Sequence, residues 1–251
     1  MTGARQILVT GAASGIGAAL AARLTAAGDQ VIGLDRAGAE IICDLADPAA
    51  IAAAAAGIAG PLGGIAHVAG LPGTADPAAI MAVNCDAPRL LTEALAPVLA
   101  PGAGVVAVAS VTAARCPLDD AAKDEWLALS PAARPTLADG KLAYEYSKAL
   151  LIRWVQHAAA TFRARGIRVN TVSPGPVETP ILADFEASIG ADRIAAAAAL
   201  TGRHARPDEI AAVVQFLLGS EAGWVNGSDI KVDGGYHALR SVGGGGGLRC
   251  A

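Results

Sequence analysis

The stretch Thr10-Gly11-Ala12-Ala13-Ser14-Gly15-Ile16-Gly17 decides the fold, because its glycines stand between a short apolar run and a longer helix-like run. Residues 6–10 read as a strand and residues 16–27 as a helix. Glycines let the backbone turn tightly, and the helix offers unpaired N–H groups and a positive dipole end to an anion. An ordinary turn can have this composition, and the spacing GxxxGxG differs from the GxGxxG dinucleotide fingerprint. The stretch therefore predicts a strand–turn–helix unit that could hold a phosphate.

Short apolar runs alternate with helix-like runs along the rest of the chain. The strand-like runs are residues 30–35, 40–43, 64–68, 104–110, 167–172 and 229–232. The helix-like runs are 48–59, 77–99 (broken or bent near Pro88), 142–165 and 207–218. This alternation predicts an α/β fold: a Rossmann-type, doubly wound parallel sheet in a single domain. Only about five residues join the second strand to the third, and a parallel crossover normally needs more. Either that crossover is a bare loop or one strand end is wrong.

Length and composition limit the class of protein. The chain has 251 residues, enough for one large domain, which we assign to 1–238 with a flexible glycine-rich tail at 239–251. The net charge of −4 comes without a basic cluster, so we expect no nucleic-acid partner. We also expect no membrane span and no signal peptide. The four cysteines (Cys43, Cys85, Cys116 and Cys250) lack CxxC spacing, which predicts no metal site and favours a reduced cytoplasm.

Asp35 closes the second strand, 18 residues beyond Gly17. An acid at about this distance is expected to bind the adenosine ribose hydroxyls of NAD and to repel the 2′-phosphate of NADP. The adjacent Arg36 could instead accommodate that phosphate, and Asp35 could simply be a solvated strand-end acid. Asp44-Leu45, after the third strand, could reach the adenine amino group or could cap the turn before Pro48.

Tyr144 and Lys148 lie four residues apart near the start of the long helix 142–165, so they share one face. A free tyrosine titrates near pH ~10, and a neighbouring ammonium is expected to lower that value. The pair therefore makes chemical sense as a proton-transfer couple for an alcohol or carbonyl oxygen. Tyr-xxx-Lys also occurs by chance, and we interpret the nearby Tyr146 as a packing residue.

Together these motifs resemble the short-chain dehydrogenase/reductase family from Thr10 to Gly235. The resemblance implies four catalytic residues. Ser110 would hydrogen-bond the substrate oxygen, and Tyr144 would be the acid/base. Lys148 would bind the nicotinamide ribose and tune Tyr144, while Asn84 would hold a water in the proton relay. Five matches in the right order, on the right elements, favour the family over chance.

The resemblance also implies the cofactor, the partners and the cofactor-binding residues. We expect NAD, a small-molecule alcohol or ketone/aldehyde substrate, and a homodimer or homotetramer. Pro174-Gly175-Pro176-Val177-Glu178-Thr179 matches the PGxxxT loop of the family, where the threonine contacts the carboxamide. The expected cofactor-binding residues are Gly11, Ser14, Gly15, Ile16, Gly17, Asp35, Arg36, Asp44, Leu45, Ala69, Gly70, Tyr144, Lys148, Pro174, Gly175, Val177 and Thr179.

Three features depart from the family pattern or lie outside it. His67-Val68-Ala69-Gly70 stands where the family often has Asn-Asn-Ala-Gly, and we expect His67 to be a local hydrogen-bonding residue. Ser110 and Tyr144 are 34 residues apart, so 114–140 looks like an insertion that either covers the substrate pocket or changes subunit association. Residues 181–200 are expected to form a mobile lid over the substrate.

The short second crossover and the insertion resemble a bacterial subgroup of the family. That subgroup contains 3α-hydroxysteroid dehydrogenase/carbonyl reductases and coniferyl-alcohol dehydrogenases. The segments 70–77 and 174–182 are most similar to the second type, which implies oxidation of an aryl allylic alcohol. A steroid or carbonyl reductase and a non-catalytic NAD-binding sensor remain as alternatives, because fold alone does not fix function.

Overall fold

The structure is a computed structural model that describes residues 4–243. Its first strand lies inside a seven-stranded parallel sheet with the order β3-β2-β1-β4-β5-β6-β7. The strands are β1 (Gln6–Thr10), β2 (Gln30–Asp35), β3 (Ile41–Ile42), β4 (Leu62–His67), β5 (Leu99–Val108), β6 (Arg168–Pro174) and β7 (Asp229–Val232). The chain reverses its direction of winding between β1 and β4, which is where ligands bind in doubly wound sheets. The predicted fold class is confirmed.

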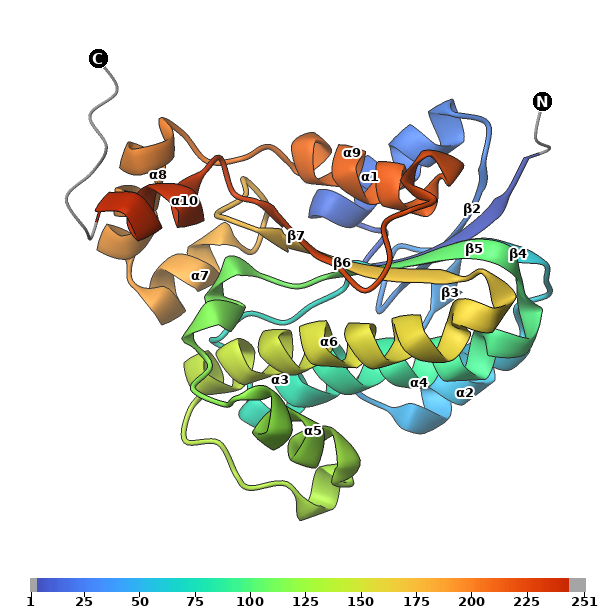
Figure 1. Cartoon of the computed structure of the whole chain (residues 1–251), viewed down its shortest axis with the longest axis horizontal. Coiled ribbons are helices and arrows are strands. Elements are labelled where there is room, and N and C mark those ends of the chain that lie inside the picture. The colour runs from blue at the N-terminus through green and yellow to red at the C-terminus, as the bar shows by residue number, and fades with distance from the viewer. Residues whose placement is uncertain (1–3, 244–251) are drawn as a thin grey trace.

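Helices cover both faces of the sheet, as Figure 1 shows. One layer is α1 (Gly15–Ala26) and α9 (Pro207–Leu218), and the other contains α2 (Pro48–Ala56), α4 (Ala87–Leu95) and α6 (Gly140–Phe162). Successive strand residues point to opposite faces, so Ile7 and Val9 join the core under α1 and α9, while Leu8 joins the core on the other side. Burial on both faces explains why the strands read as continuous apolar runs.

The crossover from β2 to β3 is a bare loop. Leu34 pairs in parallel with Ile41, and Asp35 with Ile42, with no helix between them. Both strand assignments therefore stand.

The helical segment 77–99 is broken near Pro88, as predicted, although its last residue belongs to a strand. It divides into α3 (Pro77–Met81), a π-helical turn η1 (Ala82–Asp86), α4 and a 3₁₀ turn (Ala96–Val98), and β5 already begins at Leu99. Pro88 has no N–H, so it cannot be the α-helical donor to the carbonyl of Asn84. The irregularity therefore falls before the proline, on the turn that contains Asn84.

The remaining elements lie at the edges of the two layers. A 3₁₀ turn (Val111–Arg115), α5 (Asp120–Ala128) and another 3₁₀ turn (Pro131–Ala133) precede α6, and α5 packs on the outside of α6. Beyond the carboxyl ends of the strands lie α7 (Leu182–Ile189), α8 (Ala191–Thr201) and α10 (Tyr236–Gly243). Two further 3₁₀ turns, Arg163–Arg165 and Ser220–Ala222, follow α6 and α9.

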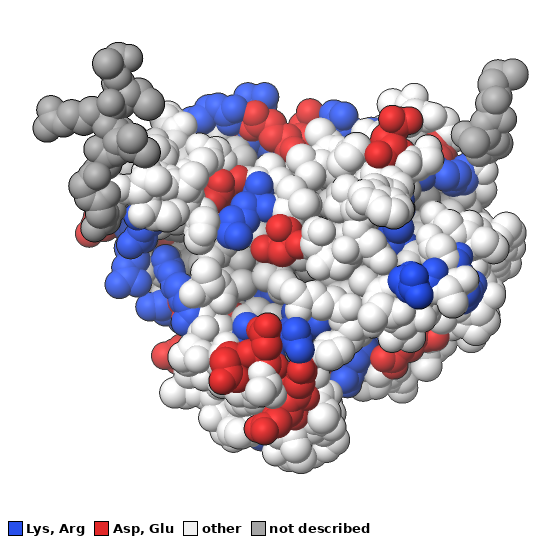
Figure 2. Space-filling view, in the orientation of Figure 1, with Lys and Arg blue, Asp and Glu red and all other residues white. Residues whose placement is uncertain are grey.

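Part of the predicted tail 239–251 is helical. Residues 239–243 belong to α10, where Arg240 donates a hydrogen bond to the hydroxyl of Tyr236 at 2.9 Å, and residues 244–251 lie outside the described residues. Within residues 4–243, no helix is long and apolar enough to cross a membrane. Figure 2 shows acidic and basic side chains scattered over the face of Figure 1, with several acidic side chains gathered at its lower part, over α5.

Candidate active site

The glycine turn connects β1 to α1 with very little space for side chains. Gly11 has a φ of +70°, and a Cβ built on it would lie 2.8 Å from the backbone nitrogen of Ala69. A Cβ on Gly17 would lie 2.0 Å from the carbonyl oxygen of Gly11. A side chain at either position would therefore push the turn away from β4 or from the start of α1. Thr10 supports the same junction, because its hydroxyl accepts hydrogen bonds from the backbone N–H groups of Val68 (3.0 Å) and Ala69 (3.1 Å).

Asp35 lies at the end of β2 and faces the glycine turn. Its carboxylate accepts hydrogen bonds from the backbone N–H of Ala13 at 3.1 Å and of Arg36 at 2.7 Å. Asp44 accepts a hydrogen bond from the backbone N–H of Ala46 at 2.9 Å, so it caps its own turn. Asp35, Arg36 and Asp44 also line the cavity described below.

Tyr144 and Lys148 share one buried face of α6. The Lys148 ammonium lies 5.6 Å from the centre of the Tyr144 ring and donates a hydrogen bond to the carbonyl of Val108 at 2.7 Å. Burial lowers the pKa of Lys148 to about 8. Burial raises the pKa of Tyr144 to about 12, and the Ser110 hydroxyl only partly opposes this shift. Desolvation of the phenolate is therefore the largest effect on the pKa of Tyr144 among the protein groups, and a lowering of this pKa by Lys148 stays a prediction.

Ser110 follows β5 and faces the same cavity. Its hydroxyl oxygen accepts hydrogen bonds from the backbone N–H of Thr112 at 3.2 Å and from the Thr112 hydroxyl at 2.9 Å. These two donors leave the Ser110 proton available to an acceptor, such as a substrate oxygen.

Asn84 is buried behind the cavity wall rather than on it. Its side-chain amide accepts a hydrogen bond from the N–H of Leu71 at 2.7 Å and donates one to the carbonyl of Leu71 at 3.0 Å. A Cβ on Gly70 would lie 3.3 Å from Asn84 Oδ1 and 3.5 Å from Lys148 Nζ. The side chains of Asn84 and Lys148 therefore both lie against the backbone of Gly70.

One cavity of about 950 Å³ joins these groups at the carboxyl ends of the strands. All of the expected cofactor-binding residues line it, and so does Ser110. Sequence reasoning missed much of its apolar wall, which includes Ile42, Val68, Leu71, Pro72, Ala79, Val111, Phe185, Ile189, Ile194 and Tyr236. Apolar side chains carry no chemical motif, and only their position just after strands or within 181–200 could have indicated them.

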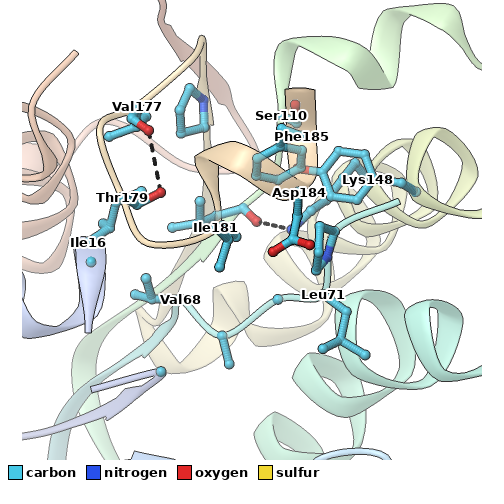
Figure 3. Close-up of a pocket in the computed structure, with 18 of the residues that line it drawn as sticks. Ile16, Val68, Leu71, Ser110, Lys148, Val177, Thr179, Ile181, Asp184 and Phe185 are labelled. Carbon is cyan, nitrogen blue, oxygen red and sulfur yellow. Dashed lines mark hydrogen bonds between the residues drawn. The ribbon is translucent and has the colours of Figure 1, made fainter. Parts of the chain in front are cut away.

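The segment 181–200 lies over one end of the cavity as α7 and α8. Phe185 packs its ring edge-on against Tyr144, with 5.3 Å between ring centres. The Thr74 hydroxyl donates a hydrogen bond to Asp184 at 3.2 Å, which ties α7 to the loop after β4. In Figure 3, Phe185, Ser110 and Lys148 gather on one side of the cavity, and Ile16 and Val68 lie on the other.

The loop after β6 completes the wall between these two ends. Thr179 donates a hydrogen bond to the carbonyl of Val177 at 3.3 Å (Figure 3). Asn170 fixes the neighbouring backbone, because its side chain donates a hydrogen bond to the carbonyl of Val225 at 2.9 Å and accepts one from the N–H of Ser228 at 3.0 Å.

His67 and Tyr146 have the structural roles that we expected. His67 Nε2 lies 2.8 Å from the Thr92 hydroxyl, and burial lowers the pKa of His67 to about 3, which keeps the ring neutral. Tyr146 packs against Trp126, with 5.3 Å between ring centres. Among residues 4–243, no group of three His, Cys, Asp or Glu side chains is placed to hold a metal ion.

Comparison with known proteins agrees with this geometry. Residues 125–237 match the family profile described as enoyl-(acyl carrier protein) reductase. The chain is 37% identical to coniferyl-alcohol dehydrogenase of Pseudomonas sp. (strain HR199 / DSM 7063), over 92% of this chain and 96% of that one. It is 34% identical to 3-alpha-hydroxysteroid dehydrogenase/carbonyl reductase of Comamonas testosteroni, over 93% and 96% of the two chains.

A solved structure shows the same architecture. The 3-alpha-hydroxysteroid dehydrogenase from Pseudomonas sp. B-0831, complexed with NADH, superposes with a TM-score of 0.84 at 34% identity, over 94% of this chain and 98% of that one. Similarity over nearly the full length of each of these chains, together with the common fold, shows that this protein belongs to the short-chain dehydrogenase/reductase family.

Proposed function

We propose that this protein is an NAD(H)-dependent oxidoreductase that transfers a hydride between an alcohol and its carbonyl, with an aryl allylic alcohol such as coniferyl alcohol as substrate. Its relatives are alcohol and hydroxysteroid dehydrogenases, so the coarser conclusion, an oxidoreductase acting on alcohols and carbonyls, rests on full-length similarity. The observation that carries the finer proposal is the position of Ser110, Tyr144 and Lys148 in one cavity that continues to the glycine turn and Asp35.

The residues present fit a nicotinamide dinucleotide. The cavity reaches from the glycine turn to Tyr144, and Gly15 and Gly17 at the α1 N-terminus line it, where a pyrophosphate would meet the unpaired N–H groups of the helix. When bound, the nicotinamide supplies the hydride acceptor or donor. Asp35 would hold the ribose hydroxyls, and its charge disfavours the 2′-phosphate of NADP. The complex of a relative with NADH agrees with this choice, although a more distant solved structure carries NADP.

The side chains at the other end of the cavity would handle the substrate oxygen. Ser110 donates a hydrogen bond to that oxygen, and Tyr144 takes its proton as the alcohol becomes a carbonyl. Lys148 holds the nicotinamide ribose and keeps a positive charge beside the Tyr144 ring, which favours the phenolate. Asn84, hydrogen-bonded to Leu71 behind Gly70, holds the water through which the proton reaches solvent.

The apolar wall favours a flat, largely apolar substrate. Leu71, Val111 and Phe185 surround the position near Tyr144, and the edge of Phe185 is suited to contact an aromatic ring. A 3α-hydroxysteroid is the second candidate, because the similarity to steroid enzymes covers nearly the whole chain and the same wall would accept a fused ring system.

The deciding experiment measures reduced nicotinamide formed from coniferyl alcohol or from a 3α-hydroxysteroid, with NAD and NADP in parallel. We expect turnover of coniferyl alcohol with NAD. A higher kcat/KM for the steroid would make a 3α-hydroxysteroid the substrate in place of coniferyl alcohol. A preference for NADP would overturn the proposed role of Asp35. NADH binding without turnover of any member of a wider alcohol and carbonyl panel would favour a non-catalytic sensor.

We also propose that the protein acts in the cytoplasm as a homodimer or homotetramer. Cys43, Cys85 and Cys116 are free thiols, which suits a reducing compartment. Light scattering of the purified protein tests the assembly, and a monomer would contradict it.

A further inference from the structure

Of the insertion 114–140, Arg115 lines the cavity, and the rest packs beside the catalytic elements. None of residues 116–140 lines the cavity wall. Instead, Trp126, Leu127 and Leu137 pack against a buried apolar cluster that includes Met81 and Cys85, on either end of the π-helical turn η1. The insertion therefore rests on the outer side of the turn that carries Asn84.

A buried ion pair fixes this contact. The guanidinium of Arg134 donates two hydrogen bonds to the carboxylate of Asp86, at 2.7 Å and 2.8 Å, and its Nε donates to the carbonyl of Trp126 at 3.3 Å. The two charged side chains are only 5% and 8% exposed. Arg89 approaches the same carboxylate at 3.8 Å and donates to the carbonyl of Leu127 at 3.0 Å.

Asp86 is the last residue of η1, two residues after Asn84. A π-helical turn is rare, and Pro88 removes an α-helical donor just beyond it. A carboxylate this deeply buried needs its partner, because the loss of one member of such a pair leaves an uncompensated charge. Burial by itself lowers the pKa of Arg134. The hydrogen bonds to Asp86 and its negative charge outweigh burial, so the pKa is raised overall and the guanidinium stays charged.

We propose that Arg134 is a positioning residue: through Asp86 it clamps the π-helical turn so that Asn84 holds Leu71 and Gly70 at the correct distance from Lys148. This inference rests on the proposed function for its kinetic consequence. It gives the insertion a role in the proton relay instead of a role as a substrate cover.

A second ion pair offers a matched control. Arg153 on α6 donates to Asp124 on α5 at 2.7 Å and 2.6 Å, so it also joins the insertion to the body of the protein through two hydrogen bonds. These side chains are 22% and 38% exposed, and His157 and Asp120 also contact them. Among the described residues, no hydrogen bond or ion pair joins either of these side chains to η1. If the insertion only needs to be attached, removal of either arginine should have the same effect.

The test compares Arg134→Met with Arg153→Met in the full-length protein. We expect Arg134→Met to lower kcat about tenfold or more, because small displacements of a catalytic group are costly, while the Kd of NADH changes less than about twofold. Amide hydrogen exchange at residues 82–86 should become faster in this variant and not in Arg153→Met. Arg134→Lys keeps the positive charge but cannot donate two parallel hydrogen bonds to the carboxylate. Its kcat should therefore lie between those of Arg134→Met and the unmodified protein.

A double variant separates position from stability. In Arg134→Met with Asp86→Leu, no charge is left buried, so Tm should recover, but kcat should stay low because the clamp is absent. Recovery of kcat together with Tm would overturn the proposal, as would equal losses in Arg134→Met and Arg153→Met. If the unmodified protein turns over no alcohol, the proposed function fails, and the exchange at 82–86 still decides whether Arg134 clamps the turn.

Discussion

At the end of the cavity near Asp35, the wall includes the closely packed main chain of the glycine turn, beside the N-terminus of α1 and the end of β2. At the other end, the wall is made of side chains from distant segments, such as Ser110, Tyr144 and Phe185. Closely packed main chain has almost no space for added atoms. Where side chains form the wall, a substitution can change the shape of the cavity. We therefore expect mutations at the first end to act on folding and cofactor binding, and those at the second to act on turnover and substrate choice.

The largest effect should come from Tyr144→Phe. Loss of the phenol hydroxyl removes the proposed proton acceptor, so kcat should fall by about 10²–10⁴-fold, while NADH still binds. Steady-state kinetics and NADH fluorescence titration measure the two quantities. Tyr146→Phe, on the same helix but packed on Trp126, is the control and should retain activity. Activity retained in Tyr144→Phe would remove this residue from the reaction.

Gly17→Ala should disrupt the other end of the cavity, at the glycine turn. The new Cβ would collide with the carbonyl of Gly11, so the free energy of unfolding should fall by about 3 kcal/mol and NADH affinity should fall with it. Denaturant unfolding and NADH titration test both effects. Gly57→Ala is the control, because a Cβ there meets its nearest atom at 3.5 Å and φ is −82°. Equal stability of the two variants would show that the turn can relax.

Asp35→Ser should alter cofactor choice without altering the fold. Removal of the carboxylate ends its repulsion of the 2′-phosphate, so the ratio of kcat/KM for NADP to that for NAD should rise by about tenfold, the equivalent of roughly 1.4 kcal/mol. The far-ultraviolet circular dichroism spectrum should not change. An unchanged ratio would mean that Arg36 or another group sets the preference.

Phe185→Ala should have a smaller effect, confined to the substrate. Loss of the aromatic edge is worth about 1 kcal/mol, so KM for an aryl alcohol should rise severalfold while the Kd of NADH stays the same. Phe216→Ala, an exposed phenylalanine on α9, controls for loss of an aromatic ring. A parallel change in NADH affinity would show that the two ends of the cavity are not independent.

Lys148 predicts a pH effect on stability. Burial lowers its pKa from 10.5 to about 8, so between these values the folded protein binds fewer protons than the unfolded chain. The contribution of Lys148 to the free energy of unfolding should therefore rise as the pH increases from about 8 to 10.5. In chemical denaturation between pH 8 and 10.5, the free energy of unfolding of the unmodified protein should rise relative to that of Lys148→Met; this comparison cancels the opposite effect of groups with raised pKa values, such as Cys85. Lys231→Met, on the exposed side of β7, should keep the rise.

The contrast between the two ends also explains what the sequence could predict. The glycine turn, Asp35 and the Tyr144–Lys148 pair are encoded by residues close together in the chain or at a regular offset, so local patterns reveal them. The contact of Phe185 with Tyr144 and the pair Arg134–Asp86 join residues 41 and 48 positions apart, and no local period links them. The π-helical turn escaped prediction for a related reason: Pro88 signals a break, but tertiary packing decides on which side the break falls.

The bare loop between β2 and β3 has a further consequence. Residues 36–40 carry no core side chains, yet they follow Asp35 directly and border the site where the adenosine ribose would bind. Exchanges in this loop would thus change recognition of the dinucleotide at little cost to packing. Natural variation could retune the choice of nicotinamide in this lineage independently of stability, and the same five positions offer an engineer a compact place to do so.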